Sequence, residues 1–107
     1  MADRFMRLLV FFDLPVNTKK RRKEYARFRK ALIQDGFLML QYSVYVRLAR
    51  NHDDAKKHLR YVEDNLPPTG SVRALTITDK QYVQMKILCG QAMADEHFLD
   101  SKELLEV

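Results

Sequence analysis

The sequence predicts an α+β fold built as one domain, and three observations support this class. The chain has 107 residues, of which 47% are hydrophobic and 31% charged, which suits one apolar core and excludes a disordered chain. Apolar runs of strand length alternate with segments whose apolar residues recur at helical spacing. Their order is strand, helix, strand, helix, strand, which is typical of a sheet packed against helices.

The first strand is predicted at residues 6–13, where apolar side chains follow one another with almost no polar interruption. Such a run is typical of a strand covered on both faces, so its expected place is central in the sheet. Pro15 ends this strand, and Asn17 or Thr18 supplies the side-chain oxygen that caps the next helix. That helix is expected to continue to about Asp35. Its core stripe is formed by Tyr25, Phe28 and Leu32.

A strand-like region is predicted at residues 37–48, directly after Gly36, which stands where the C-cap glycine of the first helix belongs. Alternate positions from Leu38 to Leu48 are apolar throughout, so they are expected to form the core face. The other parity still contains large apolar side chains, namely Phe37, Met39 and Tyr45. Because the few helices cover only one face of a sheet, this surplus predicts a second interface, most simply a homodimer.

The second helix is predicted at residues 53–66, before the Pro67-Pro68 pair. A strand is expected to follow at residues 72–78. Thr78 and Gln81 have the spacing of a capping box, which predicts that a short helix begins there. The core stripe of the second helix is formed by Ala55, Leu59, Val62 and Leu66.

The rest of the chain is expected to contain that short helix, residues 79–85, and then a brief apolar run, residues 87–89. Leu104 to Val107 are a few strand-like residues, which are stable only when they join a sheet edge, their own or a partner's. The predicted architecture is a ferredoxin-like βαββαβ sandwich of residues 1–90. A tail of residues 91–107 is expected to add a short strand to a sheet edge, of its own subunit or of a partner.

The formal net charge of +5 is distributed unevenly along the chain. Residues 1–73 contain 16 basic and 8 acidic side chains, whereas residues 74–107 contain 3 basic and 6 acidic ones. This imbalance is typical of a surface that binds a polyanion, or of a contact between neighbouring subunits. A single cysteine, Cys89, excludes an internal disulfide, and no Cys or His pair has zinc-site spacing. The first apolar run is too short for a signal peptide or a membrane span, so a cytoplasmic protein is expected.

The densest charge cluster lies at the start of the first helix. Eight of the fourteen residues from Asn17 to Lys30 are Lys or Arg, and five of them stand in the first turns. The helix dipole disfavours cations there by roughly a few tenths of a kcal/mol each. This placement favours contact with an external anion such as phosphate over a merely solvated face. The candidate DNA-binding residues are Lys19, Lys20, Arg21, Arg22, Lys23, Arg27, Arg29 and Lys30.

Asp13 is the one carboxylate at the end of the first strand. Such a residue is either the anchor of an Asx-type turn or a ligand of a divalent metal. One carboxylate supplies too few oxygens for Mg²⁺. A metal site, and a catalytic role for Asp13, therefore require a two-fold axis that brings the Asp13 of each subunit together.

The remaining reactive side chains favour structural roles. Ser43 has no His or Asp at a suggestive spacing and is expected to point from a strand, and His58 is expected among the solvated residues of its helix. Cys89 is expected to be a small core residue, unless exposure makes it reactive. Four aromatic residues are either a stacking platform for bases or parts of the core and interfaces, and the absence of an RNP1-like run favours the second interpretation. They are Phe11, Phe12, Tyr42 and Tyr45.

Three motifs, in this order, resemble the Cas-two family of CRISPR-associated proteins. They are Phe12-Asp13-Leu14-Pro15, the basic helix with its spacing of Tyr25, Phe28 and Leu32, and Gln41-Tyr42-Ser43-Val44-Tyr45. The spacing of Gly36-Phe37 and Met39 before the last motif is similar to the versions encoded beside the Cas-nine nuclease. The likeness covers the chain from Phe5 to about Gly90.

The resemblance implies a ferredoxin-like homodimer in which the two sheets pack together and the C-terminal strand completes the partner's sheet. It implies a part in CRISPR spacer acquisition, in which the dimer bridges two dimers of the Cas-one integrase and holds the duplex middle of the incoming DNA by its backbone. Several family members are also described as metal-dependent endonucleases with a strand-end aspartate as ligand. By motif match that aspartate is Asp13.

Two positions depart from the family pattern. Phe12 stands where a tyrosine is often found, and Met39 and Leu40 stand where some members carry an arginine. Both changes remove polar groups that assist phosphodiester cleavage, which weakens the expectation of nuclease activity more than that of DNA binding. The first hypothesis is therefore a non-catalytic adaptor that binds duplex DNA, and the alternative is a magnesium-dependent endonuclease. A small-ligand regulatory domain is disfavoured, because no Gly-rich loop or convergent polar pocket is predicted.

Overall fold

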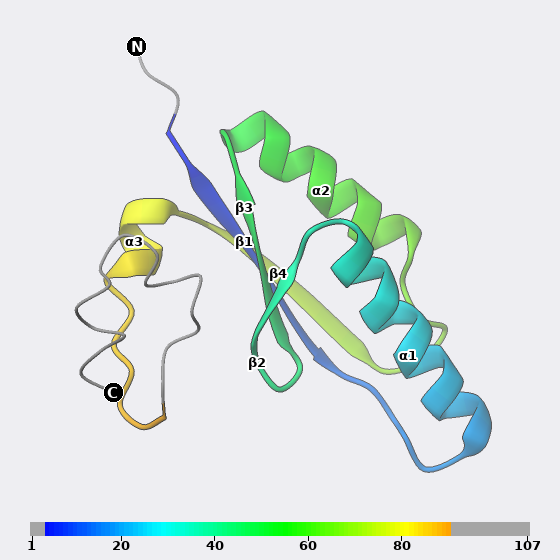
Figure 1. The fold of residues 1–107 in the computed structure, drawn as a ribbon. Coiled ribbons are helices and arrows are strands. Elements are labelled where there is room, and N and C mark those ends of the chain that lie inside the picture. Colours follow the sequence, from blue (N-terminus) through cyan, green and yellow to red (C-terminus); the bar gives the residue numbers. More distant parts are fainter. Residues whose placement is uncertain (1–3, 91–107) are drawn as a thin grey trace.

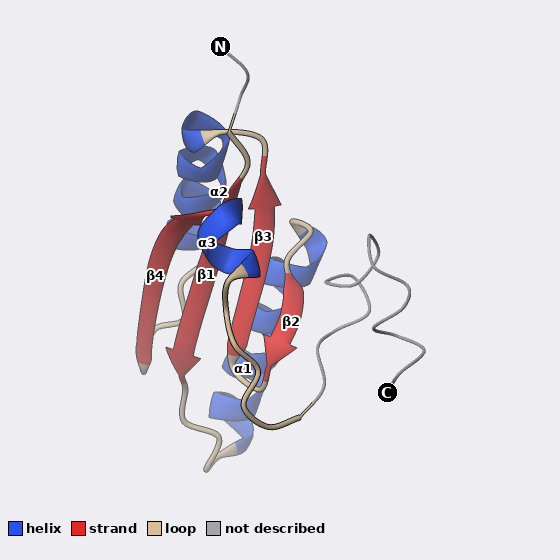
Figure 2. Cartoon of the chain, turned by 90° about the vertical axis from the view of Figure 1, so that its left-hand side faces the viewer, coloured by secondary structure: helices blue, strands red, loops and turns tan. Residues whose placement is uncertain are grey.

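The computed structural model describes residues 4–90, which form a four-stranded antiparallel sheet with two long helices on one face and a short helix on the other (Figures 1 and 2). The strand order is β2-β3-β1-β4, with β1 in the interior as expected. The predicted ferredoxin-like α+β fold is thus confirmed. The elements are β1 (Met6–Asp13), α1 (Lys19–Gln34), β2 (Leu38–Gln41), β3 (Val44–Ala49), α2 (His52–Asp64), β4 (Ser71–Thr78) and α3 (Asp79–Val83).

Local signals in the sequence set both ends of α1. The Oγ1 atom of Thr18 accepts a hydrogen bond from the backbone N–H of Arg21 at 3.1 Å, so Thr18 is the N-cap. At the other end Gly36 has a φ of +94°, which a side chain disfavours. The N–H of Gly36 donates to the carbonyl of Ile33, and the N–H of Phe37 donates to that of Leu32, both at 3.0 Å. These two bonds are the Schellman motif, which turns the chain into β2.

The strand-like region at residues 37–48 is a hairpin rather than one strand. A two-residue turn, Tyr42 and Ser43, separates β2 from β3, and Ser43 has a φ of +64°. The expected core face is also wrong. Phe37 and Tyr45 are buried at 1% exposure, whereas Leu38, from the uniformly apolar parity, is 44% exposed. Both sets of alternate residues are apolar enough to form a core. Contacts with the helices decide which set faces α1 and α2, and the alternation of apolar residues in the sequence does not reveal these contacts.

The main core lies between the sheet and the two long helices. Phe12 on β1 is at its centre: its ring packs edge-on against Phe28 of α1 at 5.2 Å between centroids and stacks on Tyr45 of β3 at 5.5 Å. Such aromatic pairs add to the stability from buried area. This core contains Leu8, Val10, Phe12, Leu14, Phe28, Leu32, Phe37, Tyr45 and Val62.

The second helix begins one residue earlier and ends two residues earlier than the sequence predicts. Asn51 is its N-cap, with the side-chain oxygen accepting from the N–H of Asp54 at 2.8 Å. Leu66 lies beyond the helix and is exposed, so it does not belong to the predicted stripe. None of the helices between residues 4 and 90 has the length and apolar character needed to cross a membrane.

The short helix α3 lies on the face of the sheet opposite α1 and α2, as Figure 2 shows. The predicted capping box is present, with hydrogen bonds in both directions between Thr78 and Gln81. The helix ends at Val83, two residues before the expected end. The predicted strand at the C-terminus, Leu104 to Val107, lies outside the described residues.

Candidate nucleic-acid interface

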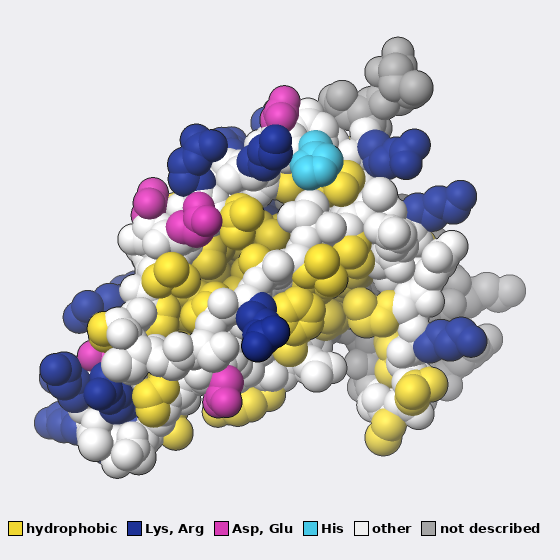
Figure 3. All heavy atoms as spheres, turned by 180° about the vertical axis from the view of Figure 1, so that it is seen from behind, with side chains coloured by type: hydrophobic (Ala, Val, Ile, Leu, Met, Phe, Trp, Pro, Cys, Tyr) yellow, Lys and Arg dark blue, Asp and Glu magenta, His cyan; other side chains and the backbone are white. Residues whose placement is uncertain are grey.

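The start of α1, the end of β1 and the β2–β3 turn lie toward the same end of the molecule (Figures 1 and 2). The α1 sequence contains eight Lys or Arg residues and one acid, Glu24, and no acidic side chain lies in its first turn. Seen from behind, a group of Lys and Arg side chains gathers at the end where α1 begins, at the lower left of Figure 3. The positive pole of α1 is therefore surrounded by cations instead of the anions that would stabilise it.

Seven of the eight predicted DNA-binding residues are exposed, and Arg21 is half-buried. The Nη1 atom of Arg21 donates to Oε1 of Glu24 at 3.2 Å and to Oγ1 of Thr69 at 2.9 Å, which links α1 to the loop before β4. The guanidinium of Arg22 donates to the carbonyl of Val16 at 3.1 Å. Within residues 4–90 the other six form no ion pair or hydrogen bond through their side chains. These unpaired cations are Lys19, Lys20, Lys23, Arg27, Arg29 and Lys30.

Asp13 is exposed at the last position of β1, where it lies opposite Ser71 of β4. Its carboxylate accepts no hydrogen bond from any described residue, so the predicted role as a turn anchor is wrong. The described part of the chain contains no group of three His, Cys, Asp or Glu side chains that would hold a metal ion. Among the described residues the end of β1 thus offers one free carboxylate, which by itself does not fit the oxygen shell that Mg²⁺ requires.

The open face of the sheet, meaning the face opposite α1 and α2, is apolar and only partly covered. Tyr82 of α3 packs there against Leu9 and Val46. The guanidinium of Arg7 lies 4.5 Å from the centre of the Tyr82 ring, and its Nε is 2.7 Å from Oδ1 of Asp79. The exposed apolar side chains of this face are Phe11, Leu38, Leu48 and Leu75.

Two other reactive residues lie in surroundings that the sequence does not predict. His58 is buried, with its Nδ1 2.7 Å from Oδ2 of Asp35 and its Nε2 3.5 Å from Oδ1 of Asp54, so its expected solvated position is wrong. The backbone N–H of Arg50 donates to the Asp54 carboxylate and holds its pKa at about 2, against the effect of burial. Cys89 is exposed rather than part of the core.

Three hydroxyl groups meet at the β2–β3 turn, a cluster that spacing along the chain does not predict. The Tyr25 hydroxyl of α1 shares hydrogen bonds with the side chains of Tyr42 and Ser43. Burial and the bond to Tyr42 raise the pKa of Tyr25. The backbone N–H of Phe12 donates to the Ser43 carbonyl at 3.0 Å, which joins this turn to the end of β1. The sequence predicts that Ser43 points from a strand. This prediction is wrong, because Ser43 is a turn residue.

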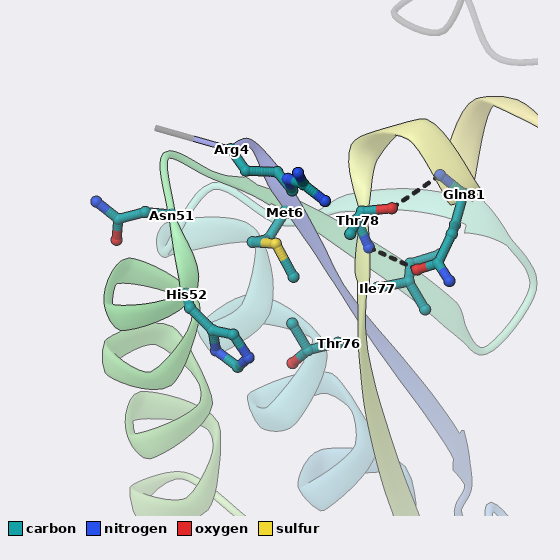
Figure 4. A pocket seen from close by; sticks show the side chains of 8 residues that line it. All are labelled: Arg4, Met6, Asn51, His52, Thr76, Ile77, Thr78 and Gln81. Carbon is teal, nitrogen blue, oxygen red and sulfur yellow. Dashed lines mark hydrogen bonds between the residues drawn. The ribbon is translucent and has the colours of Figure 1, made fainter. Parts of the chain in front are cut away.

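A hollow of about 450 Å³ lies at the other end of the sheet, near the start of β1 and of α2 (Figure 4). Met6 and Thr78, which are paired in the β1–β4 ladder, form part of its wall, seven ladder positions from the pair of Asp13 and Ser71. His52 of α2 and Thr76 of β4 point toward it, and Asn51 also lines it. No polar pocket was predicted from the sequence. The hollow is separate from the cationic end of the molecule.

Comparison with known proteins agrees with the motifs and the fold. The family model described as CRISPR associated protein Cas2 matches residues 6–85. A CRISPR-associated endoribonuclease Cas2 of Acidovorax ebreus is 46% identical over 99 residues, which cover 92% of this chain and 97% of that protein. The protein of the same name from Ligilactobacillus salivarius is 48% identical, and the match covers 84% of this chain and 89% of that protein. The one from Treponema denticola is 44% identical, and the match covers 95% of this chain and 99% of that protein. The chain therefore belongs to the Cas2 family of CRISPR-associated proteins.

Proposed function

We propose that this protein is a spacer-acquisition subunit of a CRISPR system. It is a homodimer that binds duplex DNA through the phosphate backbone and bridges dimers of the Cas-one integrase. The observation that carries this proposal is the cationic start of α1. Lys19, Lys20 and Lys23 are exposed, have no partner within residues 4–90 and stand in the first turns, where cations are unfavourable. Arg27, Arg29 and Lys30 extend this run of exposed, unpartnered cations along the helix. Phosphate groups would relieve the repulsion among these cations and would accept from the free backbone N–H groups of the first turn.

The open face of the sheet supports the dimer. Four large apolar side chains, among them Leu75 at 52% exposure, lie on a face that α3 covers only in part. Such a face can be buried against the same face of a second subunit, and the two subunits are then related by a two-fold axis. The outer edge of β4 has no neighbouring strand within the described residues, and it would accept the tail of the partner, residues 91–107.

Salt dependence of binding tests the DNA contact. The test variant combines Lys19→Ala, Lys20→Ala and Lys23→Ala. For a blunt duplex, the slope of log affinity against log salt concentration should become less negative by roughly 2 to 3 units. The control removes the same charge elsewhere, with Lys56→Ala, Arg60→Ala and Lys80→Ala. The control slope should stay close to that of the wild type. A wild-type affinity that does not change with ionic strength would refute the proposal.

Spacer integration tests the adaptor role. The protein is mixed with its integrase and a short duplex, and integration is compared for the wild type, Asp13→Ala and the triple α1 variant. An adaptor predicts integration by Asp13→Ala and loss of integration by the α1 variant. The reverse result would favour an enzyme.

A second candidate function is a magnesium-dependent endonuclease that uses Asp13 from each subunit. It is favoured by the exposed carboxylate of Asp13, which forms no hydrogen bond within residues 4–90, and by the endoribonuclease name of the relatives. It needs a two-fold axis that places two Asp13 carboxylates together, since one is too few for Mg²⁺. Asp13→Ala should then abolish cleavage of RNA or DNA and leave the thermal unfolding curve unchanged. Equal cleavage by the variant and the wild type would point to a contaminating nuclease.

A further inference from the structure

Tyr42 stands apart from the other aromatic residues of the strand region. Phe12 and Tyr45 are buried in the main core, and Phe11 lies on the open face. Tyr42 is 76% exposed at the tip of the β2–β3 hairpin. Its ring therefore contributes little to the core, although it is large and apolar.

Despite this exposure, Tyr42 is held in place by its neighbours. Its hydroxyl shares a hydrogen bond with Tyr25, whose ring packs edge-on against Phe12 at 6.0 Å between centroids. The next residue, Ser43, is anchored to β1 by the 3.0 Å bond from the N–H of Phe12 to its carbonyl. An aromatic ring that is held in this way loses little conformational entropy when a ligand packs against it.

The backbone of the turn adopts a conformation that few residues with a side chain adopt. Ser43 has a φ of +64°, the one positive value for a residue other than glycine within residues 4–90. A residue with a side chain occupies this left-handed region at a cost in free energy. The two-residue turn places Tyr42 at the tip, whereas Tyr45 returns to the core.

The helix that holds this ring through Tyr25 also carries unpaired cations. Tyr25 is on α1, and Arg29 follows it by one helical turn on the same side of the helix. Arg29 is exposed and has no partner within the described part of the chain. An accessible ring combined with unpaired cations is the arrangement that binds single-stranded nucleic acid, in which the cations bind the backbone and the ring stacks on a base.

We infer that Tyr42 stacks on an unpaired base of a nucleic acid whose backbone is bound by α1. This inference rests on the proposed binding of nucleic acid by α1. Bases inside a blunt duplex are stacked on each other and do not offer a face to the ring. The ligand is therefore a single-stranded segment or a single-stranded end next to a duplex, of DNA or of RNA. Tyr25 is a positioning residue, because it acts only through the bond that it forms with Tyr42.

The test compares a blunt duplex with the same duplex that carries a short single-stranded end containing 2-aminopurine, made once of DNA and once of RNA. Tyr42→Ala should bind the tailed duplex about tenfold more weakly than the wild type and should bind the blunt duplex equally well. The fluorescence of 2-aminopurine should be quenched by the wild type and by Tyr42→Phe, and should stay high with Tyr42→Ala. Tyr25→Phe should give a smaller loss on the tailed duplex alone. The arm that shows the larger effect identifies DNA or RNA as the ligand.

Phe5→Ala is the matched control, since Phe5 is an exposed aromatic residue beside the start of β1, at the other end of the sheet. It should leave both affinities unchanged. Equal affinity of Tyr42→Ala and the wild type for the tailed duplex would overturn the inference, as would an equal loss on both substrates. Dissociation of the dimer by Tyr42→Ala, measured by light scattering, would instead place Tyr42 in a subunit interface and would also overturn it. Failure of the proposed function is a different result, because blunt-duplex binding would then be insensitive to salt.

Discussion

The Nδ1 atom of His58 on α2 lies 2.7 Å from Oδ2 of Asp35, the residue that ends α1. The other ring nitrogen faces Asp54 at 3.5 Å. A buried imidazole between two carboxylates thus joins the end of one helix to the next helix. Since α1 carries the proposed DNA contacts, this pair helps to keep that helix in place on the sheet.

His58→Ala should lower the free energy of unfolding by about 2–4 kcal/mol, because it leaves two carboxylates without their shared partner and opens a cavity. The measurement is denaturant unfolding followed by circular dichroism. His52→Ala is the control, since His52 is exposed and should change the free energy by less than about 0.5 kcal/mol. Equal stabilities of the two variants would show that the His58–Asp35 pair contributes nothing.

Acid should destabilise the protein partly through Asp54. The pKa of Asp54 falls from the ordinary value of 3.8 for an aspartate to about 2 in the folded protein, chiefly because the N–H of Arg50 donates to the carboxylate. A depressed pKa in the folded state contributes stability that is complete above about pH 4 and is lost as the pH falls toward about 2. The melting temperature of the wild type should therefore fall more steeply over this range than that of Asp54→Asn. Asp64→Asn, a change at an exposed site, should keep the wild-type slope.

Leu75→Asp should convert the proposed dimer into a folded monomer. Leu75 is 52% exposed on the open face, so a charge there would be buried by a second subunit but is solvated in a single one. Light scattering gives the mass, and circular dichroism shows that the fold is kept. Leu66→Asp is the control, because Leu66 is 50% exposed after α2 and should leave the mass unchanged. A dimer in both variants would mean that the open face is not the interface.

Gly70→Ala should destabilise the protein more than Gly90→Ala. Both glycines have a positive φ, +99° and +97°, so a side chain is strained at either position. A Cβ at Gly70 would also lie 2.6 Å from Cδ2 of the buried Leu14 and 2.9 Å from the carbonyl oxygen of Asp13, whereas a Cβ at Gly90 meets nothing within 4 Å. We expect a loss of about 2–4 kcal/mol at Gly70 and about 1 kcal/mol or less at Gly90. Thermal unfolding measures both, and equal losses would mean that strain alone matters.

Elements that depend on residues close together in the chain were predictable. The bounds of β1, the Thr18 cap, the Gly36 turn and the Thr78 capping box all agree with the structure. The cationic surface of α1 was predictable for the same reason, since it needs only helical spacing and composition. Helix ends were less accurate: α2 begins one residue earlier and ends two residues earlier than the spacing predicts, although its Asn51 cap is itself a local bond to the N–H of Asp54.

The order of the elements, the charge of α1 and the family motifs can be predicted from the amino-acid sequence, because they follow from local spacing and side-chain type. Three other features are set by packing in the folded protein: the parity of β2 and β3 that faces the helices, the burial of His58 between Asp35 and Asp54, and the exposure of Tyr42. Each of these outcomes depends on contacts between residues far apart in the chain, where several partners of similar apolarity or charge are available. Packing of the folded chain determines which partner a residue contacts, and the periodicity of the sequence does not reveal it.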